Sequence, residues 1–215
     1  EINPSGHLAD TCAASFDDYP SSRGFHESED CVKYEEDIFV GYRFFETIPG
    51  KKEAVIYPFG YGLSYTTFQL ADLRGCDDGK TVFLSMTVTN TGTRAGKEVV
   101  QVYCRPPEGK LSKPSRVLCG FEKTKLLLPG ESQELTISFP IQAMASFDDT
   151  GVLSLSSFVL EKGKYTLYVG ENVREAKEIS YAFSLKEEMV IEKLHSFCSP
   201  RKLDRRLQAD GSFEL

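Results

Sequence analysis

The chain has 215 residues, which is enough for one domain together with a piece of another. Hydrophobic residues make up 40% and charged residues 27% of it, a balance that is typical of folded globular proteins and excludes a disordered chain. The net charge of -7 provides no basic face, so binding to nucleic acid or to a membrane is not expected.

Residues 1 to 33 are expected to be irregular. Asn3-Pro4-Ser5-Gly6 has the composition of a loop, and the chain opens without a methionine, as a piece of a longer protein would. Residues 15 to 33 are polar and turn-rich, and they show neither helical nor strand periodicity. Residues 34 to 68 are dense in aromatic side chains, and we expect them to lie along a larger body outside the chain.

The run from Tyr57 to Phe68 sets Gly60 and Gly62 among five aromatic residues. Two glycines so close together indicate a backbone that turns sharply, while the neighbouring rings are expected to pack into an interior. We therefore predict a junction that clamps two unlike domains together. Stacking of these rings on sugars is the alternative.

From Phe68 onward the pattern is that of short strands. Val82, Leu84, Met86 and Val88 occupy every second position, which indicates a strand with one buried face. Further strands are predicted at residues 97–104, 117–121, 135–139, 158–160, 165–169 and 179–185, with Gly, Pro, Asn and Asp turns between them. The strands at 158–160 and 165–169 are expected to form a hairpin. About seven such strands favour an antiparallel β-sandwich, and an eight-stranded barrel is the alternative.

The tail from residue 186 changes character. Met189, Val190 and Leu194 have helical spacing, and Ser199-Pro200 ends that run. A short basic patch follows, which we interpret as part of a solvated linker because the chain as a whole is acidic; its residues are Arg201, Lys202, Arg205 and Arg206.

Six cysteines, at positions 12, 31, 76, 104, 119 and 198, form no C-x-x-C pair and show no metal-ligand spacing. No apolar signal segment opens the chain, so free thiols and a cytoplasmic location are favoured over disulfides. Cys104 shares a strand face with Val100 and Val102, and we expect it to be a buried, unpaired thiol.

Several segments resemble glycoside hydrolase family 3, the β-glucosidase and β-xylosidase family. The resemblance is carried by the stretches Asn3–Thr11, Tyr34–Phe45, Tyr57–Phe68 and Thr89–Tyr103, of which Tyr57–Phe68 is similar to the family's P-F-G-Y-G-L-S-Y-T-x-F signature. Asp37 stands where that family usually has glycine. The tail resembles the connector of members in which the barrel domain follows the fibronectin-like domain.

The resemblance implies a mainly β protein with an immunoglobulin- or fibronectin-III-like antiparallel sandwich, preceded by the irregular end of an α/β sandwich domain. It divides the chain into residues 1–67, the end of that α/β domain with an aromatic linker; residues 68–185, the fibronectin-III-like domain; and residues 186–215, a connector tail. In this family the catalytic nucleophile and the general acid lie in other regions, so the resemblance assigns no catalytic residue here.

Carboxylate clusters are the other candidates for chemistry, because glycosidases use two carboxyl groups that flank one bond. Asp17/Asp18, Glu35/Glu36/Asp37, Asp77/Asp78 and Asp148/Asp149 each offer neighbours, but adjacent strand residues face opposite ways and Asp in loops is typical of turns. His7, His26 and His195 have no nucleophile motif beside them. We predict no catalytic, cofactor-binding or metal-binding residue in the chain.

The first hypothesis is therefore a non-catalytic part of a family-3 β-glucosidase that stabilises the catalytic domains and is inactive alone. Its expected partners are the remaining barrel and sandwich domains and, through them, a β-glucoside or β-xyloside substrate. A free-standing carbohydrate-binding module and a protein-interaction sandwich remain as alternatives. No cofactor is expected.

Overall fold

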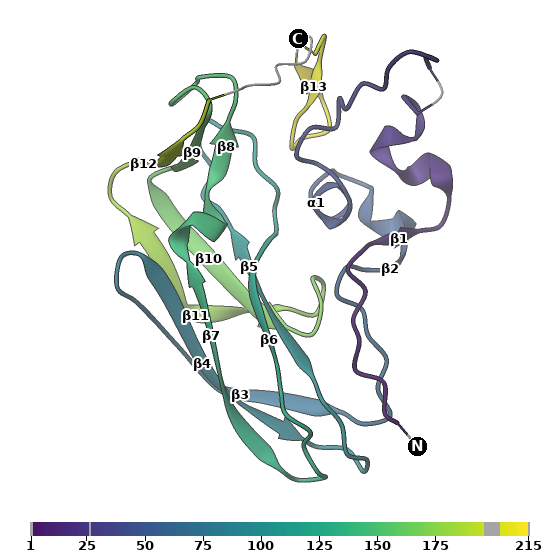
Figure 1. Cartoon of the computed structure of the whole chain (residues 1–215), viewed down its shortest axis with the longest axis vertical. Coiled ribbons are helices and arrows are strands. Elements are labelled where there is room, and N and C mark those ends of the chain that lie inside the picture. Colours follow the sequence, from purple (N-terminus) through teal and green to yellow (C-terminus); the bar gives the residue numbers. More distant parts are fainter. Residues whose placement is uncertain (1, 26, 196–202, 215) are drawn as a thin grey trace.

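The computed structural model describes residues 2–25, 27–195 and 203–214 (Figure 1). Short strands dominate it, and the helical pieces are single turns. The elements follow in this order: β1 (Cys12–Ala13), η1 (Phe16–Asp18), η2 (Pro20–Ser22), α1 (Tyr42–Phe45), η3 (Lys52–Ala54), β2 (Val55–Tyr57), β3 (Phe68–Asp77), β4 (Thr81–Asn90), β5 (Val99–Arg105), β6 (Val117–Lys123), β7 (Ser132–Pro140), η4 (Ile141–Met144), β8 (Ser146–Asp148), β9 (Ser157–Leu160), β10 (Gly163–Gly170), β11 (Lys177–Leu185), β12 (Met189–Lys193), β13 (Arg206–Leu207) and β14 (Phe213–Glu214). No helix in these ranges is long and apolar enough to cross a membrane.

Two antiparallel sheets, in the strand orders β3-β4-β7 and β11-β10-β5-β6, face one another. Alternate side chains of β4 enter the core between them, and Val82, Leu84 and Met86 are almost completely buried. They meet the inner face of β5, where Val102 and Cys104 are fully buried. The predicted antiparallel sandwich is confirmed, and the barrel is excluded because the two sheets do not join into one ladder.

The outer face of β5 is also covered, which the sequence did not indicate. Gln101 and Tyr103 alternate with the core residues and are nonetheless buried. Tyr42 and Phe59 from the N-terminal part of the chain lie against Tyr103; the ring centroids of Tyr42 and Tyr103 are 6.1 Å apart, and those of Tyr42 and Phe59 are 4.6 Å apart. The sheet therefore packs against the other sheet on one face and against the N-terminal segment on the other.

The N-terminal part has a small core of its own, beside the sandwich in Figure 1. Phe44 and Phe45 of α1 pack with Phe39 and Ile48, and Leu207 from the tail completes the cluster. Backbone and side chains also link this part to the sandwich: Ser115 donates its N–H to the Thr47 hydroxyl at 2.9 Å. Arg174 reaches the Glu46 carboxylate at 2.7 Å.

The predicted hairpin of residues 158–160 and 165–169 is wrong. Both strands exist, but β9 pairs with β8 and β12, whereas β10 pairs with β5 and β11. The connection is anchored by Glu161, whose buried carboxylate accepts the N–H of Lys110 at 2.7 Å and pairs with Lys113. The strands β9 and β10 are thus neighbours in the chain but belong to different sheets, whereas a tight hairpin would have paired them in one sheet.

The interpretation of the tail as helical and then solvated is also wrong for its described residues. Met189–Lys193 forms strand β12, because the free edge of β9 supplies backbone partners that outweigh the helical spacing of the side chains. Residues 203–214 turn into the β13–β14 ribbon at the top of Figure 1, and Leu207 is buried. Ser199, Pro200, Arg201 and Lys202 lie outside the described residues.

Candidate functional site at the junction

A cavity of about 350 Å³ opens where the N-terminal segment meets the sandwich. Its lining is mixed in character: charged side chains lie beside an aromatic ring and an exposed leucine. Those that matter for its chemistry are His7, Tyr61, Leu63, Glu98, Glu171 and Glu175. This cavity lies next to the Tyr57–Phe68 run that the sequence marked as a junction.

Backbone pairing places His7 in this cavity. Residues His7 and Gly62 form an antiparallel bridge, and Leu8 donates its N–H to the Tyr61 carbonyl at 2.8 Å. Gly60 has a φ of 82°, and a side chain there would collide with the Gln101 amide. The two glycines of the run therefore allow the N-terminal segment and β5 to approach the turn closely.

His7 holds three segments together. Its Nε2 lies 3.0 Å from Glu98 Oε1, and its Nδ1 lies 2.5 Å from the Gly60 carbonyl oxygen. A carboxylate and a carbonyl oxygen both accept, so only the imidazolium donates in both directions. The hydrogen bond to Glu98 raises the pKa of His7; burial opposes it, and the Gly60 carbonyl adds to the rise.

A buried amide extends the network across the sheet. Gln101 Nε2 donates to the Glu171 backbone carbonyl at 2.5 Å and to the Gly60 carbonyl at 3.3 Å. Its Oε1 accepts from the Tyr103 hydroxyl at 2.5 Å. Burial then raises the pKa of Tyr103, because the phenolate would lose its solvation. The network fixes the start of β5 to the turn at residues 58–62.

Glu171 is the least satisfied acid of the cavity. Its pKa is raised to about 7: burial is the largest cause, the carboxylates of Glu98 and Glu175 also raise it, and His7 lowers it. Glu98 has His7 and the Val99 N–H as partners, and Glu175 accepts from Asn172 at 2.8 Å. Within the described ranges the Glu171 carboxylate makes no ion pair and accepts no side-chain hydrogen bond.

The carboxylate clusters weighed from the sequence have structural contacts. Asp148 is buried and accepts the N–H groups of residues 150–154 at 2.6 to 3.2 Å. Burial raises its pKa, but these donors outweigh burial and hold the pKa at about 2. Asp149 pairs with Arg206. Asp148 thus closes a loop and Asp149 binds the tail, so the two carboxylates have separate structural partners.

The remaining clusters behave similarly. Asp77 and Asp78 accept turn N–H groups at 2.7 to 3.0 Å, and Asp18 closes a capping box with Ser15. Glu35 pairs with Arg205 at 2.7 Å. Asp37 pairs with Arg206 and has a φ of 51°, the left-handed region that favours glycine, which explains why glycine is usual at this position in the resembling family.

Of the two histidines that the structure describes, His7 lies in the cavity and His195 does not. His195 lies exposed at the end of β12, and His26 is outside the described residues. In the described ranges no group of three His, Cys, Asp or Glu side chains is placed to hold a metal ion. The sequence analysis did not link His7 with Glu98, although both lie in segments that carry the family resemblance; 91 residues separate them.

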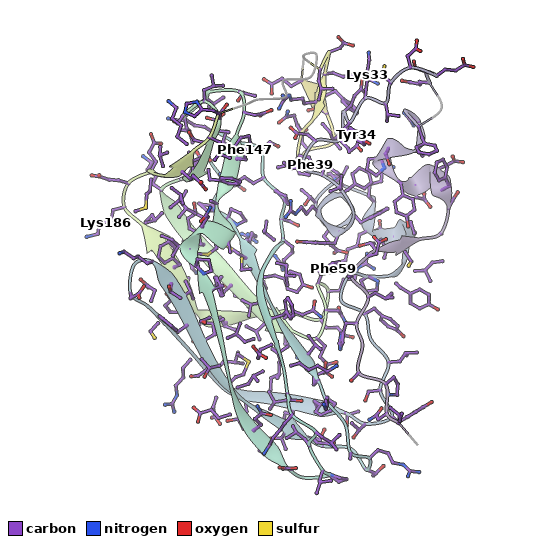
Figure 2. The ribbon with its side chains drawn as sticks, viewed as in Figure 1. Lys33, Tyr34, Phe39, Phe59, Phe147 and Lys186 are labelled. Atoms are coloured by element: carbon purple, nitrogen blue, oxygen red, sulfur yellow. The ribbon has the colours of Figure 1, made fainter. Side chains whose placement is uncertain are left out.

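The aromatic run is only partly packed. Phe59 lies between the N-terminal segment and the sandwich (Figure 2) and contacts Tyr42, as expected for a junction. Tyr57 and Tyr65, however, are 46% and 72% exposed, and Leu63 is 65% exposed. The expectation that the rings pack into an interior is therefore wrong for these two tyrosines, which are exposed; of the three residues, Leu63 lines the cavity.

Comparison with known proteins agrees with this architecture. Residues 98–173 match the family model for the fibronectin type III-like domain. Beta-glucosidase A of Butyrivibrio fibrisolvens is 47% identical over the whole chain, and a beta-glucosidase of Ruminococcus albus is 50% identical over 93% of it. A crystal structure of a beta-glucosidase from Paenibacillus barengoltzii matches 99% of the chain with a TM-score of 0.90 and 41% identity.

The chain belongs to glycoside hydrolase family 3. It contains the family's fibronectin-III-like domain, as the motifs implied. It spans 28% and 21% of the lengths of the two curated relatives and 24% of the solved chain. The cavity and its apolar rim are thus features of a non-catalytic region of this family.

Proposed function

We propose that the whole protein is a β-glucosidase, which hydrolyses terminal β-glycosidic bonds, and that this region stabilises its catalytic domains without taking part in the chemistry. The relatives named as beta-glucosidases support the activity. The observation that carries the supporting role is the burial of both faces of β5, because the N-terminal segment packs against the outer face of the sandwich there. The remaining barrel and sandwich domains are its proposed partners.

The test compares the full-length protein with the 215-residue chain on an aryl β-glucoside and an aryl β-xyloside. We expect turnover by the full-length protein and none by the chain, because two carboxyl groups placed on either side of one bond are needed and the paired aspartates of this region close turns, cap η1 or bind Arg206. Glu36→Gln in the full-length protein should leave kcat unchanged. Turnover by the chain alone that is lost in Glu36→Gln would contradict the proposal.

A carbohydrate-binding module is the second candidate, and one observation favours it. The rings of Tyr57 and Tyr65 are exposed, and exposed tyrosines can stack on sugar faces. Affinity electrophoresis in soluble β-glucan distinguishes the two. A binding module is retarded by the glucan and loses this retardation in Tyr65→Ala. A supporting domain is not retarded, so the wild type and Tyr65→Ala migrate equally.

We further propose a cytoplasmic location, supported by free thiols at Cys12, Cys31, Cys76, Cys104 and Cys119. Cys198 lies outside the described residues. Burial raises the pKa of Cys104 well above its usual range, so this thiol should resist alkylation until the protein unfolds. Mass measurement after alkylation under denaturing, non-reducing conditions should show six labels; a shortfall of two indicates a disulfide and an oxidising compartment.

A further inference from the structure

The cavity at the junction has a charge imbalance. Its lining includes the carboxylates of Glu98, Glu171 and Glu175 and the cations Lys97 and His7, so three negative groups face two positive ones. Glu98 and Glu175 already have partners in His7 and Asn172. The Asn172 amide is neutral, so neither Glu171 nor Glu175 has a cation within ion-pair distance in the described part of the chain, and the half-buried Glu171 also lacks a side-chain hydrogen bond.

The rim of the same cavity is apolar and faces solvent. Leu63 lines it and is 65% exposed, and Tyr65 is 72% exposed two residues further along. Tyr57, at the other end of the run, is 46% exposed, and its ring lies 5.1 Å from that of Tyr61, which also lines the cavity. Exposed apolar side chains of this size around a charged cavity are typical of an interface core with a buried polar contact, and a monomer surface rarely gathers them.

We propose that this cavity is a docking socket for a lysine or arginine side chain that the rest of the same polypeptide presents between apolar neighbours, an inference that rests on the proposed function. The relatives are about four times longer than the chain, so the polypeptide that would carry such a side chain belongs to the family architecture. A cation beside Glu171 would offset the burial and the carboxylate repulsion that now disfavour its charge. The apolar rim would exclude water from that ion pair and strengthen it.

Carboxyl footprinting of the full-length protein, with a carbodiimide and glycine ethyl ester, tests the socket. Leu63→Asp should speed modification of Glu171 about tenfold. The new charge lies in the apolar contact between this cavity and the rest of the polypeptide, and the carboxylate becomes accessible to the reagent when that contact opens. Glu134, which is exposed on β7, serves as the internal standard. Leu128→Asp, at a leucine that is 59% exposed in another loop, is the matched control and should change nothing.

A second variant keeps the test independent of the rim. Glu171→Lys places two cations against each other and should raise hydrogen exchange at residues 57–68 in the full-length protein, whereas Glu134→Lys should not. Equal Glu171 modification in wild type and Leu63→Asp, with unchanged exchange in Glu171→Lys, overturns the socket. A dimer in sedimentation that dissociates in Leu63→Asp also overturns it, because the occupant is then a second copy.

The outcome is separable from that of the proposed function. A full-length protein that hydrolyses β-glucosides but leaves Glu171 freely modified keeps the function and loses the socket. One that protects Glu171 yet hydrolyses neither aryl glycoside keeps the socket and loses the function.

Discussion

At the scale of single residues, Asp148 shows how one carboxylate can determine a loop. Its two oxygens accept five backbone N–H groups and the Thr150 hydroxyl, and it is almost completely buried. These hydrogen bonds satisfy the N–H groups of the loop and the buried carboxylate, which would otherwise bind water. The sequence placed a turn here, but it could not indicate that a single side chain closes it.

We expect Asp148→Asn to destabilise the protein by about 2–5 kcal/mol, because the new amide group would face N–H donors and the charge that holds them would be lost. Urea unfolding at pH 7 measures the change. Asp17→Asn, at an exposed aspartate of η1, is the control and should stay within about 0.5 kcal/mol. Equal midpoints for the two variants would show that the loop does not depend on Asp148.

At the scale of elements, strands with a clear alternation or an apolar run, such as β4, β5 and β7, were predictable, whereas β3, β12 and the β13–β14 ribbon were not predicted as strands. The alternation of β4 and β7 follows directly from their single buried face. Strand β12 is held by backbone pairing with β9, and β13 and β14 are two-residue strands that pair with each other, so these strands leave little periodic signal. The hairpin error has a related origin, since β9 and β10 are neighbours in the chain but find their partners in different sheets.

The candidate site was harder to predict from the sequence than the strands were. Its location followed from the glycines and rings of the Tyr57–Phe68 run, because only a tight turn explains that composition. Its chemistry did not, because His7, Glu98 and Glu171 lie on three segments that meet only in the folded chain. No local pattern in the sequence pairs residues over such separations.

The tail ribbon offers a test at the element scale. Leu207 is 5% exposed and completes the cluster around α1, so Leu207→Ala should cost about 2–3 kcal/mol and raise hydrogen exchange at residues 203–214. Leu128→Ala removes the same atoms from a leucine that is 59% exposed and should cost less than about 0.5 kcal/mol. Similar losses for both would mean that the tail is not part of this core.

At the scale of the whole molecule, the isolated chain should expose an apolar surface that favours association. Ile56, Tyr57, Leu63 and Tyr65 are all close to half exposed or more. A few hundred Å² of such surface corresponds to several kcal/mol at about 25 cal/mol per Å². We expect the chain to bind a hydrophobic dye or to self-associate, and the double variant Leu63→Ser, Tyr65→Ser to do so less. A monodisperse, dye-negative wild-type chain would contradict an interdomain seam.

The junction should also make stability depend on pH in a defined direction. The pKa of His7 is raised above 6.5 in the folded state, so its contribution is complete below pH 6.5 and is lost as the pH rises through the folded value. Glu171, with a folded pKa of about 7, contributes fully below its usual pKa and loses that contribution as the pH rises through 7. Asp148 does not interfere, because its folded pKa of about 2 confines its effect to acid. We therefore expect the free energy of unfolding of the chain to fall by about 1–2 kcal/mol between pH 5 and pH 8, after allowance for the partial exposure of both groups.

Urea titrations at pH 5 and pH 8 measure this fall, and two variants assign it. His7→Gln removes the imidazolium and should lower stability at pH 5 more than at pH 8, since at pH 8 wild type has already lost part of that interaction. Glu171→Gln keeps a neutral side chain at every pH and should raise stability at pH 8 while leaving pH 5 nearly unchanged. Both variants should therefore reduce the difference in stability between pH 5 and pH 8, His7→Gln by lowering the stability at pH 5 and Glu171→Gln by raising it at pH 8. A wild-type stability that rises from pH 5 to pH 8, or a slope that neither variant changes, would place the proton-linked groups elsewhere in the molecule.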